Sequence, residues 1–129
     1  MTSNQSHKAV VFGSISIDKI VNKYGTFSNL LGGSAAYALL ANKKNTCELV
    51  GVVGNDFQRK HFNLLSEHSI STNSLTKLDG NTFCWGGDYK DDFSSRETLY
   101  VDAGVSESYL PDLSEDSKNC PYLLLGCLL

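Results

Sequence analysis

The 129-residue sequence lacks the patterns of a metal site, a membrane span and a secretory signal. Its cysteines form no C-x-x-C pair and have no histidine at zinc-finger spacing, which argues against structural zinc. No stretch reaches the ~18 apolar residues of a membrane span, and the polar opening MTSNQSHK lacks the apolar core of a signal peptide. We therefore expect a flexible N-terminus over residues 1–8 and a cytoplasmic protein.

The chain contains four cysteines. Cys47 and Cys127 adjoin apolar runs, where a thiol typically behaves as a small buried hydrophobe. Free thiols of this kind fit a reducing compartment.

An excess of positive charge is also missing. Eleven basic residues against fourteen acidic ones give a net charge of −3, so we expect neither a nucleic acid nor a membrane surface as a partner. The apolar content of 41% is enough for one domain, or part of one, with a buried core.

Three motifs of nucleotide and nucleophile chemistry do not occur. The sequence has no G-x-G-x-x-G fingerprint, which argues against a nicotinamide-dependent oxidoreductase, and no G-x-x-x-x-G-K-[ST] phosphate loop. Nothing resembles a nucleophile elbow. His7, His61 and His68 are separated from one another, and we expect them to be solvated or on helix surfaces.

Short apolar runs alternate with helix-forming segments, which predicts an α/β body around a parallel sheet. The expected buried strands cover residues 9–12, 49–53 and 122–125, the first emerging through the alternation of Ile15, Ile17 and Ile20. The expected helices cover residues 35–42, 56–68 and 111–117, the last a short one. Residues 23–29 are polar and turn-rich, with Gly25 as the turn point.

Residues 81–101 no longer show the alternation of strand and helix patterns. They are instead rich in aromatic and β-branched residues. The segments FCWGGDY and ETLYV flank a charged linker, DDFSSRE, and this pattern predicts a pair of antiparallel strands. We expect these strands to be an insertion on the α/β body.

Asp18 is the first candidate for chemistry, because it follows the first strand in the segment GSISID. Ligands of open parallel sheets bind at the carboxyl ends of the strands, and a carboxylate there can accept hydrogen bonds from the hydroxyls of a sugar. The alternative is a surface aspartate that ends a strand or caps a turn.

Gly32 and Gly33 form the second candidate, since they lead directly into a helix of small residues. Glycine allows a ligand to approach the backbone, and the first N–H groups of a helix can donate to its oxygens. The alternative is an ordinary glycine-rich start of a helix.

The segment GVVGND is the third candidate, a strand that ends in glycine before a helix. Here we expect a structural role, in which Asp56 or Asn55 caps the helix by accepting from its free N–H groups.

Taken in order, GSISID, GGSAAY at a helix start, LVGVVGNDF and the β-rich stretch resemble the N-terminal region of the PfkB, or ribokinase-like, carbohydrate kinases. The resemblance covers residues 9–126. It implies a Rossmann-like α/β body within residues 9–129, and a small β lid from about residues 22–31 and 81–103 that closes over a sugar or nucleoside.

The resemblance also implies a set of substrate-binding residues. Asp18 would bind substrate hydroxyls, and Gly32 and Gly33 would line the sugar pocket. Tyr37 stands where the family usually has asparagine, and its larger phenol can both hydrogen-bond and stack on a ring. The aromatic lid residues that the resemblance points to are Phe83, Trp85 and Tyr89.

Members of this family transfer the γ-phosphoryl group of ATP with the help of Mg²⁺, and their catalytic aspartate lies in a G-A-G-D motif near the C-terminus. The sequence contains no G-A-G-D, so we expect neither a catalytic residue nor a metal ligand in it. The apolar ending YLLLGCLL would need a further strand and a covering helix, so we expect a fragment of a larger kinase fold.

The resemblance thus predicts the substrate-binding part of a carbohydrate kinase, a phosphotransferase that is inactive as this chain alone and forms a homodimer through the lid. Two alternatives stay open. The chain could be a non-catalytic sugar-binding or lid-mediated interaction module, or an incomplete product that does not fold stably.

Overall fold

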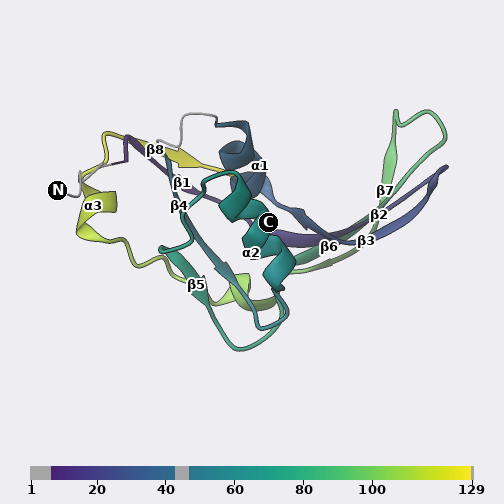
Figure 1. Ribbon diagram of the computed structural model, residues 1–129. Coiled ribbons are helices and arrows are strands. Elements are labelled where there is room, and N and C mark those ends of the chain that lie inside the picture. Colours follow the sequence, from purple (N-terminus) through teal and green to yellow (C-terminus); the bar gives the residue numbers. More distant parts are fainter. Residues whose placement is uncertain (1–6, 43–46, 129) are drawn as a thin grey trace.

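The computed structural model describes residues 7–42 and 47–128, so most of the expected flexible N-terminus, residues 1–6, lies outside the described residues. Two four-stranded sheets make up an α/β fold, and in Figure 1 the second sheet extends away from the body as a long curved ribbon. The strands are β1 (Ala9–Phe12), β2 (Ser16–Asn22), β3 (Gly25–Gly32), β4 (Cys47–Val53), β5 (Leu75–Lys77), β6 (Cys84–Tyr89), β7 (Arg96–Asp102) and β8 (Tyr122–Leu125). The helices are α1 (Ser34–Ala41), α2 (Arg59–Glu67), α3 (Glu115–Lys118) and the 3-10 helix η1 (Gly104–Glu107).

The body is the parallel sheet β5-β4-β1-β8. Its central strand β4 is buried from its second residue to its last, because it has neighbours on both edges and apolar residues on both faces. Val11, Leu49 and Val53 form one core cluster with Leu39 of α1 and Leu65 of α2. The expected α/β body with a parallel sheet is therefore confirmed. No helix among the described residues is long and apolar enough to cross a membrane.

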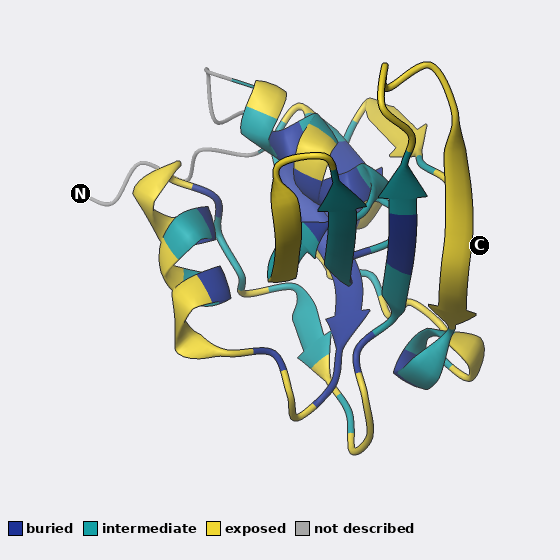
Figure 2. Ribbon diagram, turned by 90° about the vertical axis from the view of Figure 1, so that its right-hand side faces the viewer, coloured by how far each residue is buried: buried dark blue, intermediate teal, exposed yellow. Residues whose placement is uncertain are grey.

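The second sheet, which we call the lid, has the order β3-β2-β6-β7. Strands β2 and β6 run parallel, and β3 and β7 pair with them antiparallel on the outside. The expected antiparallel pair of residues 81–101 is present as β6 and β7. Of the residues expected at the emerging end of the first strand, Ile17 and Ile20 instead belong to β2 and Ile15 precedes it. The turn is confined to Lys23 and Tyr24. Every residue of β7 is exposed (Figure 2).

Strand β8 lies parallel to β1 as expected, but it is not buried. Its four side chains are 51 to 71% exposed, because β8 is an edge strand with one neighbour and no described helix covers it. The run of leucines predicted the strand correctly and its burial wrongly. Cys127, just beyond the strand, is exposed for the same reason, and Cys47 is half-buried.

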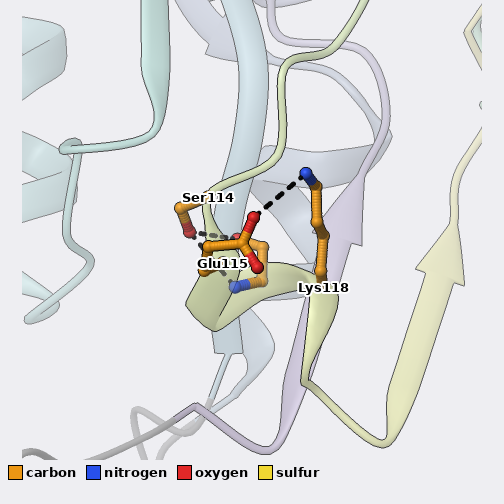
Figure 3. Close-up of polar contacts among 4 residues, drawn as sticks. Ser114, Glu115 and Lys118 are labelled. Carbon is orange, nitrogen blue, oxygen red and sulfur yellow. Dashed lines mark hydrogen bonds and ion pairs between the residues drawn. The ribbon is translucent and has the colours of Figure 1, made fainter.

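Helix α3 is shorter than the expected segment and is held by a local cap. The Ser114 side chain accepts from the backbone N–H of Ser117 at 3.1 Å, and Glu115 and Lys118 form an ion pair at 3.3 Å (Figure 3). The exposed ion pair contributes little to stability. A stronger tie is buried: the hydroxyl of Ser117 donates to the Glu48 carboxylate on β4.

The expected cap of α2 is wrong. The helix begins after Gln58, which makes no side-chain cap bond. The Asp56 carboxylate instead accepts from the backbone N–H of Thr82 at 2.8 Å and from its hydroxyl at 2.6 Å. The same hydroxyl accepts from the backbone N–H of Gly54 at 2.8 Å. Asp56 therefore ties the end of β4 to the segment that enters the lid, a partner that lies 26 residues away in sequence.

His61 also departs from expectation, since it is 2% exposed rather than on the helix surface. Its Nε2 lies 3.0 Å from Oδ1 of Asn29, whose amide donates to Gln58 at 2.9 Å. Asn29 has a φ of 58° and occupies the bulge where the register of β2 and β3 shifts. Burial, followed by the charge of Lys60, lowers the pKa of His61. The His61 imidazole thus joins α2 to the lid.

Candidate functional site

A cleft of about 590 Å³ opens between one face of the lid and the start of α1. It is lined by residues of β2, α1, β6, β7 and the connections that join them to the body: Ser14, Ser16, Asp18, Ile20, Gly33, Ser34, Tyr37, Phe83, Trp85, Tyr89, Arg96, Val101, Cys127 and Leu128. Six of the seven residues singled out from the sequence are in this group. Gly32 is the exception, although it lies against the Asp18 side chain.

Asp18 lies in β2, where the alternation of side chains places Ser16 on the same face. The hydroxyl of Ser16 donates to Asp18 Oδ1 at 2.7 Å. Burial raises the pKa of Asp18, and the hydrogen bond from Ser16 partly offsets that rise. Among the described residues no side chain donates to Asp18 Oδ2, which lies against Gly32.

The raised pKa sets the sign of the pH dependence. The folded chain holds the Asp18 proton to a higher pH than the unfolded chain does, so between the two pKa values the unfolded state binds fewer protons. Raising the pH through this window therefore lowers the contribution of Asp18 to stability. The ionised carboxylate is maintained at a cost to the fold, which is typical of groups that serve a ligand.

Gly32 is the register partner of Ser16 in the antiparallel pair of β2 and β3, and it lies against the side chain of Asp18, two residues farther along β2. A Cβ at position 32 would lie 2.0 Å from Asp18 Oδ2 and 2.9 Å from Ser16 Oγ, so a side chain there would displace the carboxylate. This close approach requires glycine at position 32.

Replacing Gly32 by alanine is expected to lower the free energy of unfolding by about 1–3 kcal/mol through this overlap. Urea unfolding followed by circular dichroism would measure the change. Ser28→Ala, at an exposed position of the same strand, is the control and should change stability by less than about 0.5 kcal/mol. An unchanged urea midpoint for Gly32→Ala would show that the two residues do not touch.

The start of α1 is built around Gly33, which has a φ of 100°. A Cβ there would lie 2.3 Å from the carbonyl oxygen of Ser14, so the glycine allows the chain leaving β1 to touch the helix. The backbone N–H groups of Ser34 and Ala35 donate to Ser14, at 3.0 Å to its hydroxyl and 3.1 Å to its carbonyl. These two donors, which the sequence suggested for a ligand, are therefore used within the protein.

Tyr37 is on α1, one turn after Gly33, and it is 61% exposed at the edge of the cleft. Its phenol is thus accessible to a ligand for stacking or hydrogen bonding.

The lid supplies an aromatic wall. Trp85 is the register partner of Asp18 in the parallel pair of β2 and β6, so both side chains are on the same face. The Trp85 ring extends along the strand over Gly87, where a Cβ would lie 2.1 Å from the ring. The guanidinium carbon of Arg96 lies 5.1 Å from the centre of this ring.

Sequence reasoning missed Arg96 and the serines of the cleft. Arg96 was placed in the charged linker, and nothing in the linear pattern shows that it folds back over Trp85. Ser16 had a detectable signal, because residues two apart on a strand share a face and Asp18 was already a candidate.

The described residues contain no group of three or more histidine, cysteine, aspartate or glutamate side chains that could hold a metal ion.

No protein-family model matches the chain, and no curated protein matches it. Solved structures do. The ribokinase from Giardia lamblia matches with a TM-score of 0.76 and 18% identity over 93% of this chain and 41% of its own. The ribokinase from Cryptococcus neoformans var. grubii serotype A, in complex with ADP, matches with a TM-score of 0.74 and 21% identity, with the same coverage.

A nucleoside kinase from Methanocaldococcus jannaschii, an archaeal member of the ribokinase family, matches with a TM-score of 0.68 and 18% identity over 93% of this chain and 44% of its own. The chain thus spans about two fifths of the length of these structures. Its α/β body and lid have a ribokinase-like fold, as the sequence resemblance predicted.

Proposed function

We propose that this chain is the acceptor-binding part of a kinase that phosphorylates a hydroxyl of a sugar or nucleoside. The observation that carries the proposal is the partly buried Asp18 carboxylate, held by Ser16 in a cleft with an aromatic wall. A carboxylate accepts from two neighbouring hydroxyls at once, which suits a diol. Aromatic rings such as Trp85 and Tyr37 pack on the face of a sugar ring or a base.

The similar structures support the proposal at the level of fold and ligand class. They include ribokinases and a nucleoside kinase, and one of the ribokinases is in complex with ADP. By this analogy ATP would be the phosphoryl donor, and Mg²⁺ would accompany it. Gly32 and Gly33 would shape the acceptor site, and Phe83, Trp85 and Tyr89 would cover the acceptor from the lid.

Phosphoryl transfer requires groups that position the γ-phosphoryl and neutralise its charge. The 129 residues contain no G-A-G-D motif, so we propose that they bind an acceptor without phosphorylating it.

We expect the purified 129-residue chain to bind at least one neutral sugar or nucleoside in calorimetric titration, and to form no ADP from ATP in its presence. Ribose, fructose and adenosine are suitable ligands, and a coupled assay with pyruvate kinase would follow ADP. Sugar-dependent ADP formation would contradict the proposal that the chain binds an acceptor without phosphorylating it. If no ligand binds to a chain that unfolds cooperatively, the acceptor site itself is wrong.

A second candidate is an interaction module that acts through the lid, including a homodimer. It is favoured by β7, in which Leu99 and Tyr100 lie outside the cleft and are 47 and 41% exposed. Sedimentation over a range of concentrations distinguishes the two candidates, because self-association through the lid is blocked by Leu99→Lys, whereas acceptor binding in the cleft is not.

A further inference from the structure

We propose that the acceptor carries an anionic group, a phosphate or a carboxylate, and that Arg96 binds this group. The inference rests on the proposed function, because it names the class of polyol that the same cleft accepts. It starts from the charges of the cleft: among its lining residues Asp18 is the one acid and Arg96 is the one base.

The two charges are separated along the lid. Asp18 is the register partner of Trp85, and Arg96 is the register partner of Tyr89, four residues farther along β6. At about 3.3 Å per residue, the backbones of these two pairs are roughly 13 Å apart. The Arg96 side chain reaches back over the Trp85 ring. The cleft thus has an acidic end for hydroxyl groups and a basic end above the aromatic wall.

The position of the guanidinium is set by the sequence of β6. Because Gly87 has no side chain, the Trp85 ring can lie flat along the strand, and its face receives the Arg96 guanidinium at 5.1 Å. Stacking on a ring uses the face of a guanidinium and leaves the N–H groups on its edge free to donate. Those donors match the two oxygens of a carboxylate or phosphate.

Arg96 also lacks an internal counter-ion. The ion pairs among the described residues join Lys90 to Asp88 and Glu97, and Lys118 to Glu115. Lys90 thus pairs with Asp88 and Glu97 on the lid, and among the described residues no carboxylate forms an ion pair with Arg96. A cation that is oriented by a ring, faces a cleft and has no anion of its own is suited to an anionic ligand.

Calorimetric titration of the 129-residue chain with matched ligands tests the proposal. D-fructose is the neutral ligand, fructose 1-phosphate and fructose 6-phosphate carry a phosphate, and D-gluconate carries a carboxylate. We expect at least one anionic ligand to bind about tenfold or more tightly than fructose, and the difference to shrink with added salt. Inorganic phosphate alone should bind more weakly than the preferred sugar phosphate, and sodium acetate more weakly than gluconate.

Arg96→Gln should abolish the preference for the anionic ligand over fructose. Arg59→Gln, which removes the same charge from α2 outside the cleft, is the matched control and should keep the preference. Gly87→Ala displaces the Trp85 ring and keeps the charges of Asp18 and Arg96. It should reduce the preference for the anionic ligand over fructose, and it replaces Arg96→Gln in the test if that variant fails to fold.

Equal binding of neutral and anionic ligands by the wild-type chain would overturn the inference and leave the proposed function in place. A preference that persists in folded Arg96→Gln would also overturn it, as would binding of inorganic phosphate as tight as that of a sugar phosphate. If neither fructose nor any anionic ligand binds, the proposed function fails together with this inference.

Discussion

Replacing Thr82 by valine is expected to lower the free energy of unfolding by about 3 kcal/mol. Thr82 is fully buried, and its hydroxyl donates to the Asp56 carboxylate and accepts from the Gly54 N–H. Valine has the same shape but removes both bonds. It leaves a buried N–H without its acceptor and the carboxylate with one donor fewer.

Urea unfolding would measure the loss. Far-ultraviolet circular dichroism reports on the whole chain, and the fluorescence of Trp85, the only tryptophan, reports on the lid. Because Thr82 joins the body to β6, we expect the fluorescence transition to move at least as far as the transition of the whole chain.

The matched control is Thr98→Val, in the exposed strand β7, where the same change should alter stability by less than about 0.5 kcal/mol. If the two valine variants are equally stable, Asp56 and Thr82 do not hold the lid to the body.

Replacing Asp18 by asparagine is expected to weaken acceptor binding by about 10- to 100-fold, the effect of losing charge-assisted hydrogen bonds. The affinity of the wild-type chain should fall as the pH drops through the raised pKa of Asp18, because protonation removes the charge. The asparagine variant should show no such dependence, and calorimetry at several pH values would distinguish the two.

The same variant should not lose stability at neutral pH. Burial penalises the ionised form of Asp18, and asparagine removes that penalty while keeping an acceptor for Ser16. Asp112→Asn, at an exposed position outside the cleft, is the control for the change of charge. Unchanged affinity in Asp18→Asn would rule out the carboxylate as the group that binds the acceptor.

Local patterns were sufficient for the elements and for part of the site. The apolar runs at residues 9–12 and 49–53 predicted β1 and β4, because a strand with a neighbour on each side needs apolar residues on both faces. The paired glycines at 32 and 33 correctly predicted the start of α1. Asp18 was singled out as the residue that follows the first strand, whereas the structure places it within β2 of the lid.

Long-range partners were not predictable from these patterns. Asp56 had the sequence pattern of a helix cap. It instead accepts hydrogen bonds from Thr82, because the segment before β6 lies beside the end of β4. His61 has a polar side chain on a helix, and its burial depends on the bulge at Asn29. In β8 the apolar run indicated a buried strand, but burial requires neighbours that the described residues do not supply.

The sequence by itself determined the α/β class, the inserted antiparallel strands and the resemblance to ribokinase-like kinases, because periodicity, glycine pairs and turn residues act within a few positions of one another. Only the tertiary structure decided which charges share the cleft. Asp18 and Arg96 are 78 positions apart in the sequence, and both line the same cleft. The parallel pairing of β2 and β6 places Asp18 beside Trp85, and the Trp85 ring, which extends over Gly87, contacts Arg96. A contact of that separation depends on strand register, which no local pattern contains.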